Sequence, residues 1–289
     1  MGAFRLAVCA AVAGATLAGP AGWTASGLAA TPSGPSARPA AAASHDRAVP
    51  WTGILPPHNP SRSLPPVPFF LTSSHCRGGQ DGPRCNTLVL RAIARARSRL
   101  EHMRGMSFSL AAYERLRPIE QLFVTVNLER ISRGLRPALE LTKSLDKIAQ
   151  AGANADTDPD LRRVPHTLPG GGQPRGEGGN WAGGADNALG SDYGWMYDDG
   201  LHSPNAACSR AHRAGCWGHR DIILGSFFNS AQICGGGPNE LVMGAGHIRS
   251  GKLYGDSETE LLVGVCGPVP TDVVFTWAKA KRLLHIRHY

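Results

Sequence analysis

Six cysteines after residue 70 constrain the fold of this chain more than any other feature of its sequence. They are Cys76, Cys85, Cys208, Cys216, Cys234 and Cys266. In an exported chain an even number predicts three disulfides, for which fifteen pairings are possible. Pairing nearest neighbours is the simplest solution and gives Cys76–Cys85, Cys208–Cys216 and Cys234–Cys266. A zinc ribbon would need closely spaced Cys-x-x-Cys pairs, which this sequence lacks.

Residues 1–30 have the pattern of a secretory signal peptide. Arg5 precedes the apolar run Leu6–Leu17, which Gly19-Pro20 interrupts, and small residues at 28–30 offer a cleavage site. The apolar run is shorter than the about 20 residues that span a bilayer. We therefore expect a soluble mature chain with no transmembrane segment, secreted or associated with the cell wall. A retained signal anchor is the alternative.

Two segments are expected before the main domain. Residues 31–68 are rich in Ala, Pro and Ser, so they cannot bury enough apolar surface to offset chain entropy and are predicted to form a disordered or extended linker. Residues 69–110 are predicted to form a small helical extension, closed by Cys76–Cys85. In it Asn86 caps a helix that runs to about Met103, with apolar residues roughly on one face: Leu88, Ile93, Ala96 and Leu100.

The main domain is expected to cover residues 111–270 and to begin with helices. Pro118, followed by apolar residues at helical spacing as far as Val126, predicts a helix that ends at Gly134. Further helices are predicted from Thr142 or Ser144, over about 187–199, and from near His219. Residues 156–187 are polar and rich in glycine, and we expect them to form a functional loop.

The hydrophobic period changes in the last part of the chain. Leu241–Ile248 and Glu258–Cys266 have strand composition and are separated by turn residues. Helices followed by a hairpin predict an α+β fold in which helices cover a sheet. Residues 271–289 are expected to form a basic C-terminal tail, with a solvated helix over Lys279–His288.

Four motifs in order resemble a known family. They are Asn127-x-x-Arg130-x-x-x-Gly134-Leu135-x-Pro137-x-Leu139; Gly176-Glu177 with Asn180; Trp195-Met196-Tyr197-Asp198; and Cys216-Trp217-Gly218-His219-Arg220-Asp221-Ile222-Ile223-Leu224. Together they cover about residues 115–266. They are similar to motifs of the CAP superfamily (cysteine-rich secretory, antigen 5, pathogenesis-related 1), in its secreted bacterial SCP-like form.

The resemblance implies an α-β-α sandwich with two histidines and two acids in one cleft. Carried onto this sequence, the histidines are His166 and His219, and the acids are Glu177 and either Asp198 or Asp199. Imidazoles and carboxylates are zinc-type ligands, so a divalent metal such as zinc could bind with His166 and His219 among its ligands. Without a metal, the acids would raise the pKa of the histidines and keep them partly protonated.

Charge and export together favour a binding function at the cell envelope. The formal net charge is +8 at pH 7, and the isoelectric point is near 9.4. Because an exported protein does not meet nucleic acid as its usual partner, we expect anionic wall polymers, peptidoglycan fragments or lipids. The sequence has no Gly-x-Ser-x-Gly element, and Cys216 is expected in a disulfide, which favours a protein that is not an enzyme.

Two alternatives remain open at the level of sequence. One is a metal-dependent hydrolase of peptide or amide bonds, with His219 and His166 as metal ligands and Glu177 as the general base for a bound water. The other is a protein–protein interaction module whose main surface is the loop between Cys208 and Cys216.

Overall fold

The structure is a computed structural model, and it describes residues 83–185, 187–200, 217–225, 234, 239–252 and 255–286. The expected signal peptide and linker lie outside the described residues, as do Cys76, Cys208 and Cys216. The elements are α1 (Pro83–Glu101), α2 (Leu110–Tyr113), α3 (Pro118–Ile131), β1 (Glu140–Thr142), α4 (Lys143–Ala155), η1 (Leu161–Arg163), β2 (Gln173–Gly183), α5 (Ala188–Tyr197), α6 (Gly218–Leu224), β3 (Asn239–Gly251), β4 (Gly255–Cys266), β5 (Val273–Thr276) and α7 (Trp277–Leu284).

The strands form one mixed sheet in the order β2-β4-β3-β1-β5. β3 and β4 make the long antiparallel hairpin that the sequence predicts, and β2 pairs antiparallel with the other side of β4. β1 runs parallel to β3, and β5 runs antiparallel to β1. The prediction of a loop over 156–187 is therefore wrong for β2, and the prediction of a tail over 271–289 is wrong for β5.

Glycine conceals β2 from sequence analysis. The strand contains Gly176, Gly178, Gly179 and Gly183, and glycine weakens an isolated strand. Here the missing side chains allow close packing: a Cβ at Gly179 would lie 3.0 Å from the carbonyl oxygen of Glu260 and 3.0 Å from the ring of Pro159. Pairing with β4 selects the strand, and local propensity does not.

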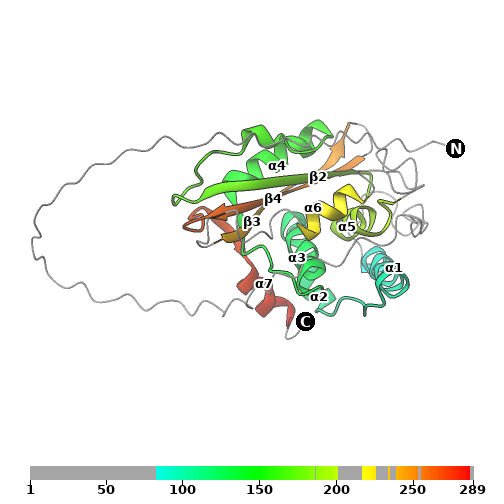
Figure 1. Cartoon of the computed structure of the whole chain (residues 1–289). Helices are drawn as coiled ribbons and strands as arrows, with labels where there is room; N and C mark the ends of the chain where they lie inside the picture. Colours follow the sequence, from blue (N-terminus) through cyan, green and yellow to red (C-terminus); the bar gives the residue numbers. More distant parts are fainter. Residues whose placement is uncertain are drawn as a thin grey trace, which may run out of the picture.

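α4 covers one face of the sheet (Figure 1). Glycines let the helix approach closely, because a Cβ at Gly244 would lie 2.3 Å from the carbonyl carbon of Leu145. The helix begins where predicted, but its N-terminus is capped from a distance, by Asp272 Oδ2, which accepts from the Ser144 N–H at 2.7 Å. Its buried side belongs to a hydrophobic cluster that contains Leu145, Ile148, Ala149, Leu168, Val242, Leu261, Val263 and Val265.

α3, α5 and α6 cover the opposite face (Figure 1). α3 starts at Pro118 as predicted and is buried from Glu120 to Arg130. Asn127 fixes the chain that follows it, since its Nδ2 donates to the Ala138 carbonyl at 3.0 Å and its Oδ1 accepts from the Ala138 N–H at 2.7 Å. The expected α+β class is thus seen as a mixed sheet with helices on both faces.

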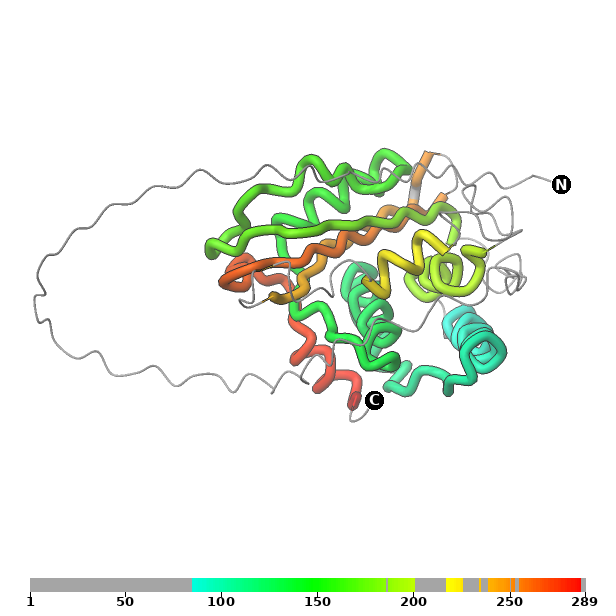
Figure 2. Tube along the Cα trace, in the orientation of Figure 1, coloured from blue at the N-terminus to red at the C-terminus, as the bar shows by residue number. Residues whose placement is uncertain are grey.

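α1 packs beside α5 and shares the main core (Figure 2). Asn187, the N-cap of α5, accepts from the Gly190 N–H at 2.8 Å. Its Nδ2 donates to Asn86 Oδ1 at 3.1 Å and approaches Cys85 Sγ at 3.3 Å. The described part of the expected 69–110 extension is therefore joined to the rest of the fold.

The C-terminal helix is also part of the core. Trp277, Ala280 and Leu284 of α7 are buried in the cluster that contains α3 and α5 side chains, which corrects the expected solvated helix. None of the described helices is long and apolar enough to cross a membrane.

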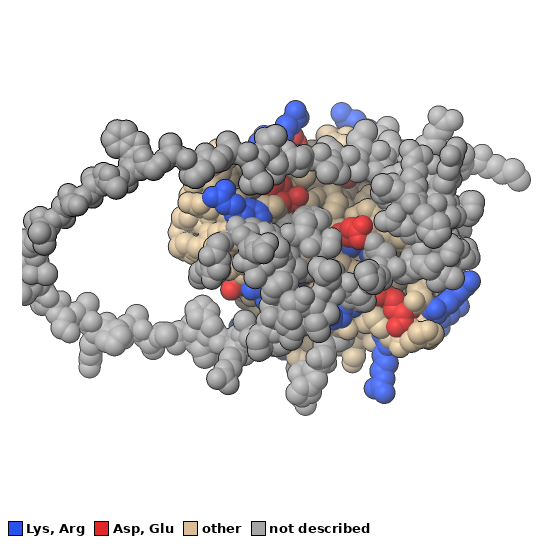
Figure 3. Space-filling model, in the orientation of Figure 1, with Lys and Arg blue, Asp and Glu red and all other residues tan. Residues whose placement is uncertain are grey.

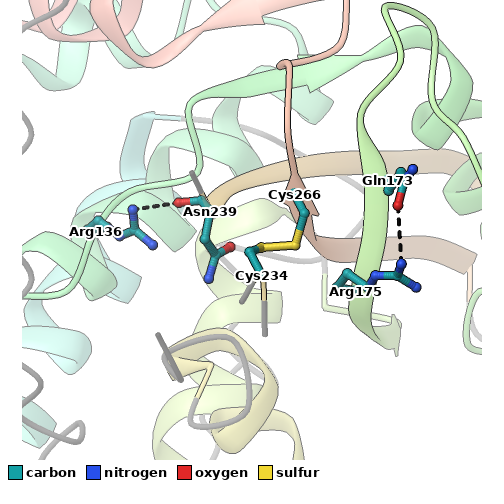
Figure 4. The surroundings of a disulfide bond; sticks show 6 residues. All are labelled: Arg136, Gln173, Arg175, Cys234, Asn239 and Cys266. Atoms are coloured by element: carbon teal, nitrogen blue, oxygen red, sulfur yellow. Dashed lines mark hydrogen bonds between the residues drawn. A yellow bond between two sulfur atoms is a disulfide. The ribbon is translucent and has the colours of Figure 1, made fainter. Parts of the chain in front are cut away.

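One predicted disulfide is present. Cys234 bonds to Cys266 at the end of β4, with their Cα atoms 5.5 Å apart (Figure 4). The bond ties the end of β4 to Cys234, which precedes the hairpin. At the start of β3, Arg136 donates to the Asn239 carbonyl at 2.6 Å. Cys85 is also disulfide-bonded, to a cysteine outside the described residues. The Cys208–Cys216 pairing lies outside them altogether.

Candidate functional site

The site is built around His219 at the start of α6. Asp199, two residues after the end of α5, binds this start through three contacts. Its carbonyl accepts from the Trp217 N–H at 3.0 Å, and its Oδ2 accepts from the His219 N–H at 2.8 Å. Its Oδ1 lies 2.8 Å from His219 Nδ1. One carboxylate thus fixes both the helix start and the imidazole.

The sheet supplies a polar base for this pair. Asn180 of β2 lies opposite Glu260 of β4, and its Nδ2 donates to Glu260 Oε1 at 2.6 Å. The same Nδ2 donates to the His219 carbonyl at 3.0 Å, so the sheet and α6 are joined through one amide. Asn180 and Glu260 are completely buried. The position of His219 is therefore set from both the helix and the sheet.

A turn after α4 brings a further acid toward the site. Asp156 ends the helix with a φ of 52°, and the Thr157 N–H donates to the Gly152 carbonyl at 3.2 Å. Pro159 then packs on Gly179 of β2. Asp158, between these contacts, accepts from the Trp181 backbone N–H and interacts electrostatically with His219.

The charges of the site follow from burial and from these neighbours. Burial alone would lower the pKa of His219, but the ion pair with Asp199, helped by Asp158 and Glu260, raises it above its ordinary value. Burial raises the pKa of Asp199 against the opposing effect of His219. Burial raises the pKa of Glu260 to about 8, although Asn180 and His219 oppose the shift. The site therefore favours the protonated imidazole more than water does, beside a Glu260 that is largely neutral near pH 7.

This arrangement favours donation of a proton or a hydrogen bond by His219. Nδ1 is directed to Asp199, so Nε2 is the ring nitrogen left for a ligand, and the side chain is 10% exposed. A carboxylate that binds one imidazole nitrogen fixes the tautomer and the orientation of the ring. The protonated ring can donate to an anionic oxygen or to a carbonyl oxygen.

Of the candidate acids, the structure brings Asp199 to His219. Asp198 ends α5 and is buried, but it interacts with Tyr193, whose pKa is raised by burial and then by the charge of Asp198. The sequence motifs lead us to expect His219 near at least one of Glu177, Asp198 and Asp199, and in the structure the acid in contact with it is Asp199.

Glu177 is not part of this group. It pairs with Val263 of β4, and Val263 belongs to the cluster beneath α4. Directly opposite residues of paired strands share a face of the sheet, so Glu177 lies on the α4 face, whereas Asn180 and His219 lie on the other. The hydrolase mechanism with Glu177 as its base needs both side chains at one place, and this geometry does not provide it.

His166 is also separated from His219. It is exposed in the loop between η1 and β2, close to Leu168, whose N–H donates to the Gly172 carbonyl at 2.8 Å. Gly172 precedes the first residue of β2, and from there to Asn180 the strand extends by roughly 23 Å. Within the described residues, no group of three or more His, Cys, Asp or Glu side chains could hold a metal ion.

Sequence analysis missed Asp158, Glu258 and Glu260. Glu258 and Glu260 are buried in β4, and Glu258 Oε2 accepts from Ser191 Oγ at 2.5 Å. A signal was present, because Glu258 and Glu260 lie two residues apart at the start of the expected strand and so share one of its faces. Charges on the buried face of a strand are unusual and indicate a polar site.

Arg220 connects the site to a buried ion-pair network. It follows His219 on α6, donates to the Met196 carbonyl at 2.9 Å and pairs with Glu101 of α1. Glu101 also pairs with Arg133, two residues after the end of α3. The side chains of both arginines are fully buried, so Glu101 supplies charge that they cannot obtain from water.

The comparisons with known proteins do not add to this description. No protein-family model, curated protein or solved structure matches the chain.

Proposed function

We propose that this protein is exported and acts at the cell envelope as a CAP-type binding protein, with His219 and Asp199 at its ligand site. The observation that carries the proposal is the double contact of Asp199, which holds both the backbone N–H and the ring nitrogen of His219 at 2.8 Å. The buried carboxylate fixes the orientation of the nearly buried imidazole, so Nε2 is held in a defined direction as a hydrogen-bond donor.

Export is supported by the disulfides. Cys234–Cys266 closes 32 residues of chain, and Cys85 is bonded as well. Disulfides of this structural kind persist in oxidising compartments outside the cytoplasm. They agree with the signal-peptide pattern of residues 1–30.

The CAP assignment is supported by the sequence motifs and by where they fall. Asn127 fixes the turn after α3, and Asn180 joins β2 to α6. His219 begins a short helix beside an acid that follows the Trp195 segment. These are the roles that shared motifs would have in a common architecture of helices on both faces of a sheet.

The ligand that suits this site is an anionic or carbonyl-bearing envelope component. The His219 ring, whose pKa is raised, can donate to such an oxygen when it is protonated, and the net charge of +8 attracts polyanions over a longer range. Wall polymers and peptidoglycan fragments carry these groups. Catalysis is not required for this function.

A retention assay with purified envelope fractions tests the proposal. The mature protein is compared with His219→Gln and with His166→Gln, which removes an exposed histidine far from the site. We expect wild type and His166→Gln to be retained equally at about 0.15 M salt, and His219→Gln to be retained several-fold less. Equal retention of all three proteins, or a loss confined to His166→Gln, would refute the site.

A further inference from the structure

α1 has two faces of different chemistry. Its inward face contributes Val89, Ile93 and Ala96 to the core. Its outward face carries Arg91, Arg95 and Arg99, and all three are exposed. Successive arginines are four residues apart, which places them about 6 Å apart along the helix axis. Figure 3 shows Lys and Arg side chains over the part of the molecule that α1 occupies in Figure 1.

These three arginines are not neutralised within the described part of the protein. None of them takes part in an ion pair there. The acidic residue of α1, Glu101, turns inward and pairs with buried arginines. Like charges four residues apart on a helix repel one another, so the row has a cost that an external anion would remove.

The row is also held on a rigid support. Arg97, between Arg95 and Arg99, is buried and pairs with Glu129 of α3 at 2.6 Å. Its Nε donates to the Arg104 carbonyl at 2.8 Å, which fixes the end of the helix. The outward arginines therefore lie along a helix that is already ordered, so binding a ligand does not carry the entropy cost of ordering the backbone.

The surroundings favour a hydrated polymer over a lipid bilayer. Helices that lie in a membrane interface place large apolar side chains beside their cations. Among the described residues the exposed large hydrophobic side chains are Val273 and Leu283, and neither is on α1. Leu88, one turn before Arg91 on the same face, is partly buried, so the row of cations has no fully exposed apolar side chain beside it among the described residues, and such a row matches a linear polyanion.

We propose that Arg91, Arg95 and Arg99 bind a linear phosphodiester polymer of the cell envelope along the axis of α1. Guanidinium groups bind phosphate through two parallel hydrogen bonds, which favours arginine over lysine at such a surface. The inference rests on the proposed envelope function for the source of the polymer, but it assigns a surface separate from His219.

Binding to fluorescent poly(glycerol phosphate) tests the surface. The mature protein is compared with the triple variant Arg91→Gln, Arg95→Gln, Arg99→Gln over about 0.05 to 0.3 M salt. The matched control is Lys147→Gln, Arg163→Gln, Arg175→Gln, which removes the same charge from exposed positions on α4, η1 and β2. Circular dichroism and thermal melting establish that each variant is folded.

We expect the α1 variant to bind roughly tenfold more weakly, and its salt dependence to fall by about 2 in log–log slope, near 0.7 for each lost phosphate contact. The control should stay within about twofold of wild type, because its charges lie elsewhere. Equal losses in both triple variants would reduce the effect to net charge and overturn the proposal, as would no loss in the α1 variant.

Two further arms identify the source of the phosphate. Single-stranded DNA of equal phosphate content and phosphatidylglycerol vesicles replace the polymer. Stronger arginine-dependent binding to either of them would overturn the assignment. The His219→Gln variant separates this surface from the proposed site. If the His219→Gln variant alone loses envelope retention, the arginine row of α1 is refuted and the His219 site stands. If the α1 variant alone loses polymer binding and envelope retention, the His219 site is refuted.

Discussion

At the scale of single residues, Asp199 is the neighbour that most raises the pKa of the His219 imidazole. Burial lowers the pKa of the imidazole, whereas the charge and hydrogen bond of Asp199, together with the charges of Asp158 and Glu260, raise it by more, so the net shift is upward. A histidine with a raised folded-state pKa adds stability that is complete below its unfolded pKa near 6.5. That stability is lost as the pH rises through the folded pKa.

The substitution Asp199→Asn should reverse this shift. The asparagine keeps the shape of the side chain but not its charge, so burial dominates and the His219 pKa should fall below about 6.5. Titration of the histidine side chains by ¹H–¹⁵N NMR measures it, with His166 as an internal reference. A His219 pKa that remains above its ordinary value in the variant would show that Asp199 is not the main cause.

Glu260 gives a second prediction at this scale. Its folded pKa is about 8, above the unfolded value of 4.5, so folding holds a proton that the unfolded chain releases. Its stability contribution is complete below pH 4.5 and is lost as the pH rises toward 8. Glu260→Gln should therefore raise the free energy of unfolding at pH 8 by a few kcal/mol, since one pKa unit is worth about 1.4 kcal/mol.

Urea unfolding at several pH values checks this expectation. The stability difference between Glu260→Gln and wild type should shrink toward zero near pH 4.5. A variant that is less stable than wild type at pH 8 would show that Glu260 is ionised in the folded protein and stabilised by His219.

At the scale of elements, α1 and α6 are connected by buried charge. Glu101 of α1 pairs with Arg220, the neighbour of His219, and with Arg133, which follows α3. These contacts lower the pKa of Glu101 to about 2 against the effect of burial, so the carboxylate is charged at neutral pH. The orientation of α6 thus depends on a helix that lies more than a hundred residues earlier in the chain.

Glu101→Gln should destabilise the fold by about 3 kcal/mol, because it leaves the buried Arg220 without its counter-charge and removes one of the two carboxylates that pair with Arg133. It should also change the NMR signals of His219 through Arg220. Arg117→Gln removes one partner of an exposed ion pair and serves as the control, with an expected loss of at most about 1 kcal/mol. A loss no larger than that of the control would show that the network does not hold α1.

The sequence predicts the elements that have apolar runs and clear start signals. α3, α4, α5, α6 and the β3–β4 hairpin lie where expected: α4 buries one face at helical spacing, whereas α3, α5 and β4 are buried almost continuously and are recognised by their apolar composition and flanking residues. β1 and β5 are 3 and 4 residues long, too short for any period to appear. β2 is selected by pairing and by close approach at Gly179, which no local pattern reveals.

The same limit applies to the candidate site. His219 and Asp199 lie at helix termini that the sequence predicts, but the expectation that His219 meets an acid comes from the motif resemblance, which leaves Asp198 and Asp199 as alternatives. Glu177 was expected with them, but the face on which a strand residue lies depends on register. Glu260 enters the site only through its pairing with Asn180 across β2 and β4.

At the scale of the whole molecule, α1 belongs to the same cooperative unit as the sheet. Its apolar residues share one cluster with α3 and α5, and Asn187 joins the start of α5 to Asn86. A chain that begins at residue 118 should therefore fail to fold, because it exposes this surface and leaves Glu129 and Arg133 without α1. Expression of 118–289 beside 83–289 with limited proteolysis tests this, and a stable, protease-resistant 118–289 fragment would restore a modular boundary.

The most direct test of the proposed binding site is NMR of the ¹⁵N-histidine-labelled mature protein, titrated with soluble envelope fragments. We predict that the His219 ring signals shift and saturate, and that its pKa rises when an anionic ligand is bound, because the anion stabilises the protonated ring. The His166 signals should not move. If the fragments bind to saturation while His219 stays unchanged, the ligand site is elsewhere and the account is contradicted.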